Sequence, residues 1–294
     1  MSRRLIHALA TVVLTVLLGG LAAATLVRYA PGFGVDEREF DARFSEESKR
    51  RMRAESQGPA EGILLYYVHY LARAAHGDLG FSSGFRRPAG ELIAERFPQT
   101  ARAAGAGLAA GWALGMLLAL AAVAIARPGF DVLAGAWTAF FLCLPSSVVA
   151  LAFVIAGRTD GRSAAAGVIA LVIFPRVFRY ARAILGKVAA APHVLMARAR
   201  GVGRLGVILN HVLRPAAPSV LALLGVSVSV AFGAAIPIEV ICDSPGLGQL
   251  AWQAALKRDL PLLIDITLVV TVLAGISGLA AEAARPPGAA DEAS

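Results

Sequence analysis

The sequence is short of charge, aromatic residues and cysteine. Only 16% of its 294 residues are charged, 7% are aromatic, and there are 2 cysteines. Soluble domains carry roughly 25% charged residues, so this chain has too little polar surface to cover a soluble core. Cys143 and Cys242 show no CxxC spacing and stand near no histidine cluster. We therefore expect no disulfide framework and interpret both as small buried hydrophobic residues.

Motifs for catalysis and nucleotide hydrolysis are missing as well. There is no GxxxxGK[ST] phosphate loop, because Gly186 and Lys187 are followed by Val188. There is also no HExxH metal motif and no GxSxG nucleophile elbow. We therefore expect no catalytic residue, no metal ligand and no cofactor, and any energy source must belong to another chain.

Acidic residues are unevenly spread. The formal net charge is +8, and no Asp or Glu occurs from Gly161 to Ile238. A basic balance can indicate nucleic-acid binding. In a membrane protein, however, Lys and Arg collected in cytoplasmic loops are the simpler cause, so we expect no nucleic-acid partner.

What the sequence has in abundance is long apolar runs. Hydrophobic residues make up 57% of the chain. A membrane-spanning helix needs about 20 mostly apolar residues. Six stretches qualify, at about 5–27, 101–126, 132–156, 164–184, 216–241 and 262–281. The predicted fold class is all-α, a polytopic membrane protein with six transmembrane helices and membrane lipid around it.

Two of these stretches need comment. Arg3 and Arg4 before the first run, with alanines at its end, also suit a cleavable secretory signal. That run is longer than a typical signal core, which favours an uncleaved span. The fourth run ends in Arg176, Arg179 and Arg182, which we expect to mark the boundary between membrane and cytoplasm.

The loops between the spans predict an orientation. With the N-terminus cytoplasmic, the basic segment 185–215 lies inside and the mixed segment 242–261 lies outside. The predicted divisions are an N-terminal transmembrane helix at 1–27, an outer (periplasmic) segment with short helices at 28–99, a five-helix membrane core at 100–284 and a cytoplasmic tail at 285–294. In the outer segment we expect an amphipathic helix using Leu64, Tyr67, Val68 and Leu71, and a second short helix over 88–97.

Small residues recur every four positions in two of the spans. The residues concerned are Gly107, Gly111 and Gly115 in the second span, and Gly225, Ser229 and Gly233 in the fifth. Such faces let helix backbones approach each other. We expect them to pack helices within the chain, and the alternative is contact with a second membrane subunit.

The segment 185–215 predicts a helix, a tight turn and another helix. Pro192 is suited to the first position of a helix and Gly201 to the residue after its end. A second helix over about 204–214 should end before Pro215. A basic loop that only sets topology is the alternative, and spacing alone does not separate the two.

The stretch LMARARGVGRLGVILNHVLRPAAPSVLALLG resembles the EAA-type loop of the inner-membrane permease subunits of ABC importers. It is most similar to the dipeptide, oligopeptide and nickel branch. The segments LVRYAPG (26–32), GDLG (77–80), RRPAGELIAERFPQTA (86–101) and IEVICDSPGLGQLAWQAALKRDLPLL (238–263) fit the same branch in the same order. In the last of these, the outer-loop motif is Ser244, Pro245, Gly246, Leu247 and Gly248.

The resemblance implies a type I ABC importer permease architecture and a coupling role for the inner loop, at about 192–214. The matching positions are Leu195, Ala197, Arg198, Ala199, Arg200, Gly201, His211, Leu213 and Arg214. The general EAA pattern has Glu where this chain has Leu195. The implied partners are a second permease subunit, two ABC ATPase subunits and an extracytoplasmic substrate-binding protein. The implied solute is peptide-like or of the nickel type, and the implied location is the bacterial inner membrane.

Two other classes of function stay open at this stage. A stand-alone secondary carrier or channel would act without ATPase partners; the lack of acidic residues deep in the predicted spans argues weakly against it. A membrane-embedded enzyme would need a nucleophile and base at one depth. For Ser146 and Ser147, the one candidate histidine in a neighbouring span is His7, near the inner end of the first predicted span.

Overall fold

A computed structural model describes most of the chain. The described residues are 10, 11, 13–15, 17–22, 25, 63–156 and 160–284. The predicted first span lies partly outside them. The predicted outer segment up to residue 62, the tail at 285–294 and the LVRYAPG stretch lie outside them entirely.

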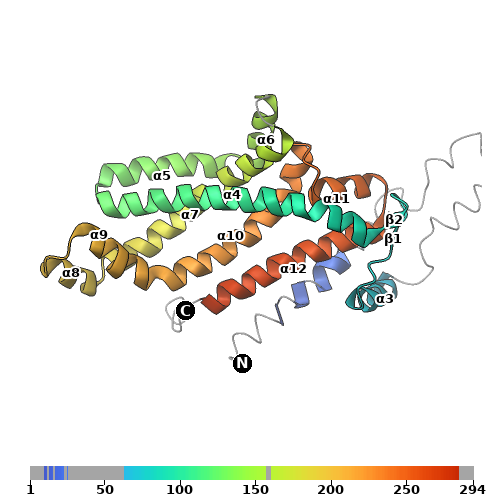
Figure 1. Cartoon of the computed structure of the whole chain (residues 1–294), viewed down its shortest axis with the longest axis horizontal. Coiled ribbons are helices and arrows are strands. Elements are labelled where there is room, and N and C mark those ends of the chain that lie inside the picture. The colour runs from blue at the N-terminus through green and yellow to red at the C-terminus, as the bar shows by residue number, and fades with distance from the viewer. Residues whose placement is uncertain are drawn as a thin grey trace, which may run out of the picture. The chain divides into compact units, whose positions relative to one another are not determined.

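The described part of the chain is almost wholly helical, which confirms the all-α class. Its helices are α3 (Ile63–Ala75), α4 (Ala89–Ile125), α5 (Pro128–Cys143), α6 (Ser146–Ile155), α7 (Gly161–Ala189), α8 (Pro192–Ala199), α9 (Arg204–Gly206), the π-helix η2 (Val207–Leu213), α10 (Arg214–Ile241), α11 (Leu247–Leu256) and α12 (Leu260–Ala284). Two-residue strands β1 (Phe81–Ser82) and β2 (Arg87–Pro88) form an antiparallel hairpin. Figure 1 shows these elements.

Helix α4 differs from the two helices that the sequence predicts at 88–97 and 101–126. It runs without a break from Ala89 to Ile125, with Pro98 inside it. Proline has no N–H and leaves the carbonyl four residues earlier without its donor. That carbonyl belongs to Ala94, which is exposed, so the helix continues past Pro98. The predicted boundary between residues 99 and 100 therefore falls within a helix.

The predicted third span is also different, because it is broken. Helices α5 and α6 are bent by 86° at the break between them. Pro145 stands before the first residue of α6 and has an extended backbone with ψ 135°. A residue before proline is likewise pushed out of the α region, as Leu144 is. The Leu144–Pro145 pair thus ends one helix and starts the next in a new direction.

By length and composition, three helices of the described residues can cross a membrane, or four if the bent pair counts as one span. The three are Ala89–Ile125, Arg204–Ile241 and Leu260–Ala283. Helix α7 is long enough at 29 residues, but its second half carries three arginines and Lys187. The predicted number of six spans therefore stays a prediction.

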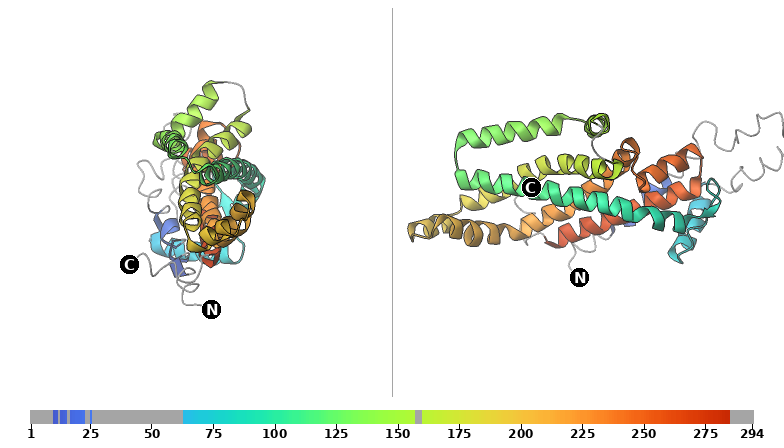
Figure 2. Two further views of the ribbon diagram at one scale, coloured as in Figure 1. Left: turned by 90° about the vertical axis from the view of Figure 1, so that its left-hand side faces the viewer. Right: turned by 45° about the horizontal axis from the view of Figure 1, so that its top comes forward.

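The chain divides into two compact units, and the larger holds Arg96–Leu250 and Val272–Ser294. Helix α7 lies at its centre, with α5, α6 and α10 packed against it. The views of Figure 2 show α7 and α10 running alongside each other. Arg182 of α7 forms a two-pronged ion pair with Asp131 in the first turn of α5, with N–O distances of 2.9 and 2.6 Å.

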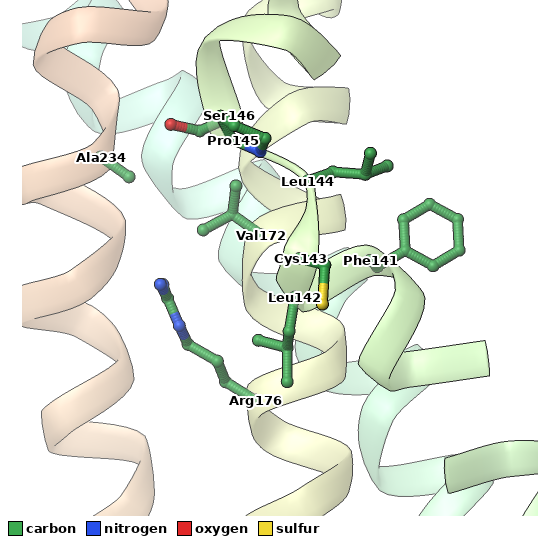
Figure 3. Close-up of a pocket in the computed structure, with 9 residues that line it drawn as sticks. All are labelled: Phe141, Leu142, Cys143, Leu144, Pro145, Ser146, Val172, Arg176 and Ala234. Carbon is green, nitrogen blue, oxygen red and sulfur yellow. The ribbon is translucent and has the colours of Figure 1, made fainter. Parts of the chain in front are cut away.

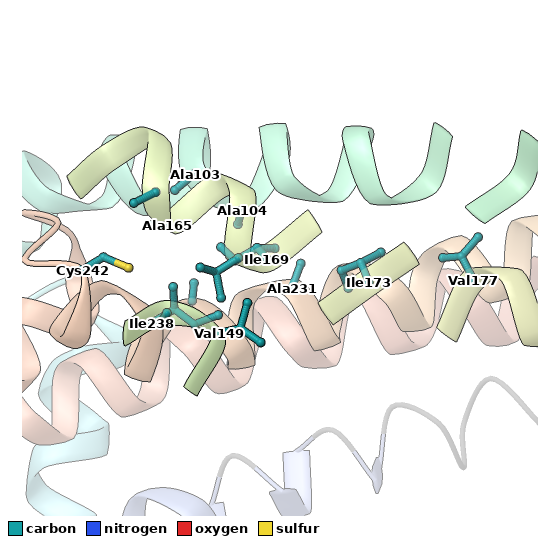
Figure 4. Packing of buried hydrophobic residues seen from close by; sticks show 14 residues of the cluster. Ala103, Ala104, Val149, Ala165, Ile169, Ile173, Val177, Ala231, Ile238 and Cys242 are labelled. Atoms are coloured by element: carbon teal, nitrogen blue, oxygen red, sulfur yellow. The ribbon is translucent and has the colours of Figure 1, made fainter. Parts of the chain in front are cut away.

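Small residues bring α4 close to α7. A Cβ added at Gly107, Gly111 or Gly115 would lie within 3.0 Å of backbone oxygens and β-branched side chains of α7. The buried cluster beside this contact includes Ile169, Ile173 and Val177 (Figure 4). The glycines are therefore positioned where a side chain would push the two helices apart.

The second small-residue face behaves differently along its length. A Cβ at Gly225 would meet Ala281 at 2.7 Å, and the Ser229 hydroxyl donates to the Ala274 carbonyl at 3.0 Å. Both contacts tie α10 to α12. A Cβ at Gly233 would instead meet nothing within 4 Å among the described residues. Within the described residues Gly233 therefore makes no close helix contact, unlike Gly225 and Ser229.

The cysteines also differ from one another. Cys242 is buried, as expected, whereas Cys143 at the end of α5 is exposed. Cys143 is the last residue of α5, at the break before α6.

The smaller unit holds Leu14–Glu95 and Ala251–Thr271. Asp259 precedes α12 and accepts hydrogen bonds from the Leu262 N–H, at 3.3 Å, and from the Ser82 hydroxyl of β1. It thereby caps α12 and holds the hairpin. In α3 the buried tyrosines are Tyr67 and Tyr70, while Val68 is exposed. The buried face of α3 is thus rotated from the predicted one, since Tyr70 donates its hydroxyl to Asp265 of α12.

Candidate functional site

The segment between α7 and α10 folds into a short helix laid against the start of a long one. Helix α8 begins at Pro192, whose missing N–H needs no partner at the first helical position. Its Val194 and Ala197 are buried, and both belong to one cluster with Val207 and Val212 of η2. Apolar burial on one side therefore fixes α8 to the base of α10.

The turn after α8 confirms the prediction made for Gly201. Its φ is +78°, a left-handed conformation that favours glycine. The Gly201 N–H donates to the Arg198 carbonyl at 3.0 Å, and the Val202 N–H donates to the Ala197 carbonyl at 3.2 Å. This pair of bonds is the Schellman arrangement that ends a helix and reverses the chain.

The helix predicted for 204–214 does not end before Pro215. It continues through the π-helix η2 into α10, and Arg204–Ile241 is a single helical run. In η2 the Arg214 N–H bonds to the Leu209 carbonyl, five residues back. The wider turn lets the chain pass Pro215, which has no N–H for the His211 carbonyl.

His193 supplies a donor for that carbonyl. Its Nε2 lies 3.0 Å from the His211 oxygen. Since a carbonyl can only accept, the Nε2 atom must carry the proton in this contact. The bond joins the first turn of α8 to η2. From the sequence, His193 looks like an ordinary polar residue of a loop. The contact could not be predicted because it requires knowing that the helix continues past Pro215 and leaves the His211 carbonyl without a backbone donor.

The other side of α8 and its turn is exposed. We call this side the α8 surface; its members are Leu195, Met196, Arg198, Arg200, Val202, Arg204, Leu205 and Leu209. Leu195 and Leu205 are 71% and 73% exposed. Exposed large apolar side chains with arginines nearby in the sequence are typical of a protein–protein contact.

The residues predicted for the inner loop differ in their exposure. Leu195, Arg198, Ala199, Arg200, Gly201 and Arg214 are exposed, whereas His211 and Leu213 are half-buried. Ala197 is buried and contributes to the core beneath α8. The α8 surface also includes Met196, Leu205 and Leu209, which sequence reasoning missed because their apolar periodicity looks like that of core residues.

The outer-loop motif wraps around one buried carboxylate. The Gly248 N–H donates to Glu239 Oε2 at 2.7 Å, and the Ser244 N–H donates to the Glu239 carbonyl at 2.9 Å. A Cβ at Gly246 would lie within 3.0 Å of the Glu239 carboxylate. The Leu247 N–H donates to the Thr100 hydroxyl of α4 at 2.8 Å. A Cβ at Gly248 would clash with the Ile236 backbone, so glycine is needed at both positions where the loop approaches α10.

These features define a polytopic membrane protein in which the short helix α8 is packed against the start of a long candidate span, Arg204–Ile241. A family model described as "Binding-protein-dependent transport system inner membrane component" matches residues 111–284, more than half of the chain. The chain belongs to this family, the inner-membrane permeases of ABC importers. It is therefore a multi-pass protein of the inner membrane.

Two relatives are similar over most of their length. The chain is 29% identical over 233 residues to the oligopeptide transport system permease protein OppB of Escherichia coli K12, covering 72% of this chain and 74% of the relative. It has the same identity and coverage with OppB of Salmonella typhimurium.

Proposed function

We propose that this chain is one permease subunit of an ABC importer for peptides and that the α8 surface docks onto a cytoplasmic ATPase subunit. The peptide substrate is supported by the similarity to oligopeptide permeases over most of the chain. The nickel-type alternative has no comparable support. A second permease, two ATPases and an extracytoplasmic binding protein would complete the transporter.

The observation that carries the docking proposal is the mechanical continuity of the loop with a membrane span. Helix α8 is fixed by a buried cluster and by the His193 bond to η2, which runs directly into α10. A force on the α8 surface therefore reaches α10 without a flexible joint. ATP-driven movement of the partner would shift the spans between inward-facing and outward-facing states.

The proposal includes an orientation. The N-terminus, the 127–131 loop and the 185–215 loop lie in the cytoplasm, and the 242–261 loop and the outer part of 28–99 face the binding protein. Lys and Arg in the short loops support it. Helix α4 runs through residues 99 and 100, so no chain break separates the outer segment from the membrane core there. In this proposal the division marks only where α4 passes from the outer side into the membrane.

Docking is tested by a double substitution, Leu195→Asp with Leu205→Asp, in the tagged chain expressed with its neighbours in the native host. We expect more than a ten-fold loss of copurifying ATPase subunits, with the second permease retained. Two carboxylates in an apolar contact lose hydration without gaining a partner.

The matched control is Phe81→Asp, an equally drastic change at an exposed apolar residue of β1. It should leave the ATPases bound. An unchanged ATPase yield from the double variant would overturn the docking surface. A native chain that purifies alone in mild detergent would favour a stand-alone carrier.

A further inference from the structure

A cavity of about 320 Å³ opens at the break between α5 and α6. Its lining residues are Phe141, Leu142, Cys143, Leu144, Pro145, Ser146, Val172, Arg176 and Ala234. They come from both sides of the break and from α7 and α10 (Figure 3). The volume lies at the lower end of the range for small-ligand sites, roughly 300–1,000 Å³.

Arg176 is the one charged residue in this lining. It extends from α7 toward the side of the cavity where Ser146 and Ala234 lie (Figure 3). Helix α7 runs from Gly161 to Ala189, so Arg176 stands about 20 Å from either end at 1.5 Å per residue. Arg176 therefore lies near the middle of α7, and its side chain is exposed.

No hydrogen bond or ion pair joins Arg176 to another residue within the described part of the chain, whereas Arg182 is paired with Asp131. The sequence offers little else, because no Asp or Glu occurs from Gly161 to Ile238. An ionisable side chain that lines a cavity of a membrane protein is a candidate part of a substrate pathway. Within the described residues nothing neutralises Arg176, so its guanidinium is available to a negatively charged ligand.

The first turn of α6 faces the same cavity. The Pro145 carbonyl accepts hydrogen bonds from the N–H groups of Val148 and Val149. The N–H groups of Ser146 and Ser147 precede these and have no acceptor within α6. They add to the positive potential that Arg176 creates, and the Ser146 hydroxyl adds a neutral donor.

We propose that this cavity binds a carboxylate of the transported peptide during its passage, with Arg176 as the recognising group. This inference rests on the proposed function. A guanidinium presents parallel N–H donors that match the two oxygens of a carboxylate. The remaining lining is mostly apolar and leaves room for the rest of a small peptide.

The test uses the complete transporter, with its binding protein and ATPases, reconstituted in lipid vesicles. ATP-dependent uptake of trialanine is compared with uptake of its C-terminal amide, for the native chain and for Arg176→Gln. The binding protein is the same in every sample, so its own preference cancels when the acid-to-amide ratios are compared. We expect Arg176→Gln to lower this ratio roughly ten-fold.

The matched control is Arg179→Gln, which removes an exposed arginine of the same helix that does not line the cavity. It should leave the ratio unchanged, and Arg176→Lys should restore only part of it. An equal effect of Arg176→Gln on both peptides, no effect, or the same change from Arg179→Gln would overturn the site. A native transporter that takes up neither peptide would contradict the proposed function itself.

Discussion

At the scale of single residues, Glu239 shows how one side chain can organise a loop. Its carboxylate and its carbonyl accept hydrogen bonds from two different residues of the outer loop, Gly248 and Ser244. Glu239 itself is fully buried. A buried carboxylate is retained in a protein only where hydrogen bonds offset its lost hydration.

Replacing Glu239 by alanine is expected to destabilise the chain by about 1–3 kcal/mol, because the Gly248 N–H loses its acceptor in a buried place. The measurement is thermal unfolding of the purified chain in detergent. Glu239→Gln keeps an acceptor oxygen and should lose less. Equal stability of the alanine variant and the native chain would contradict this role, as would an equal loss in both variants.

At the scale of secondary-structure elements, the contact between α4 and α7 depends on the absence of side chains. The Cα atoms of Gly107, Gly111 and Gly115 stand against the backbone of α7. Helices in lipid gain no hydrophobic energy from association, so close van der Waals contact is what holds such a pair.

Substituting Gly111 by alanine should therefore cost about 1–3 kcal/mol, since the new Cβ would lie 2.8 Å from the Ala170 carbonyl oxygen. The readout is the unfolding temperature in detergent. Gly105→Ala on the same helix is the control, because its Cβ would meet nothing within 4 Å. That control should be neutral or stabilise by up to about 1 kcal/mol. A Gly111 variant that behaved like the Gly105 variant would refute the close contact.

At the scale of the whole molecule, the proposed orientation is what places the α8 surface and the outer loop on opposite sides of the membrane. It rests on the distribution of Lys and Arg among short loops. Cysteine chemistry can examine it directly, because the native chain has only Cys143 and Cys242 to remove.

In a chain with both cysteines changed to alanine, Phe81→Cys should react with a membrane-impermeant maleimide added to intact spheroplasts. Gly129→Cys, in the loop predicted to be inside, should react only after the membrane is opened. Both positions are exposed in this chain, so neither is shielded by its own fold. The reverse pattern of labelling would invert the proposed topology.

Much of the fold and of the candidate site was predictable from local sequence. Apolar runs indicate an all-helical membrane protein, and Pro192 with Gly201 predicts a helix and its end, since both residues act through their own backbone. The EAA-type stretch and the outer SPGLG motif carry the family resemblance, which the family match confirms.

Only the tertiary structure decided which helices break and which faces are buried. Proline ends a helix at Leu144–Pro145 but not at Pro98 or Pro215. At Pro98 the carbonyl left without a donor is that of Ala94, which is exposed. At Pro215 it is that of His211, which accepts a hydrogen bond from His193. Ala197 is buried and Leu195 is exposed on the same short helix, and Arg176 lines a cavity. Burial, exposure and cavity lining depend on how distant segments pack, which no local pattern contains.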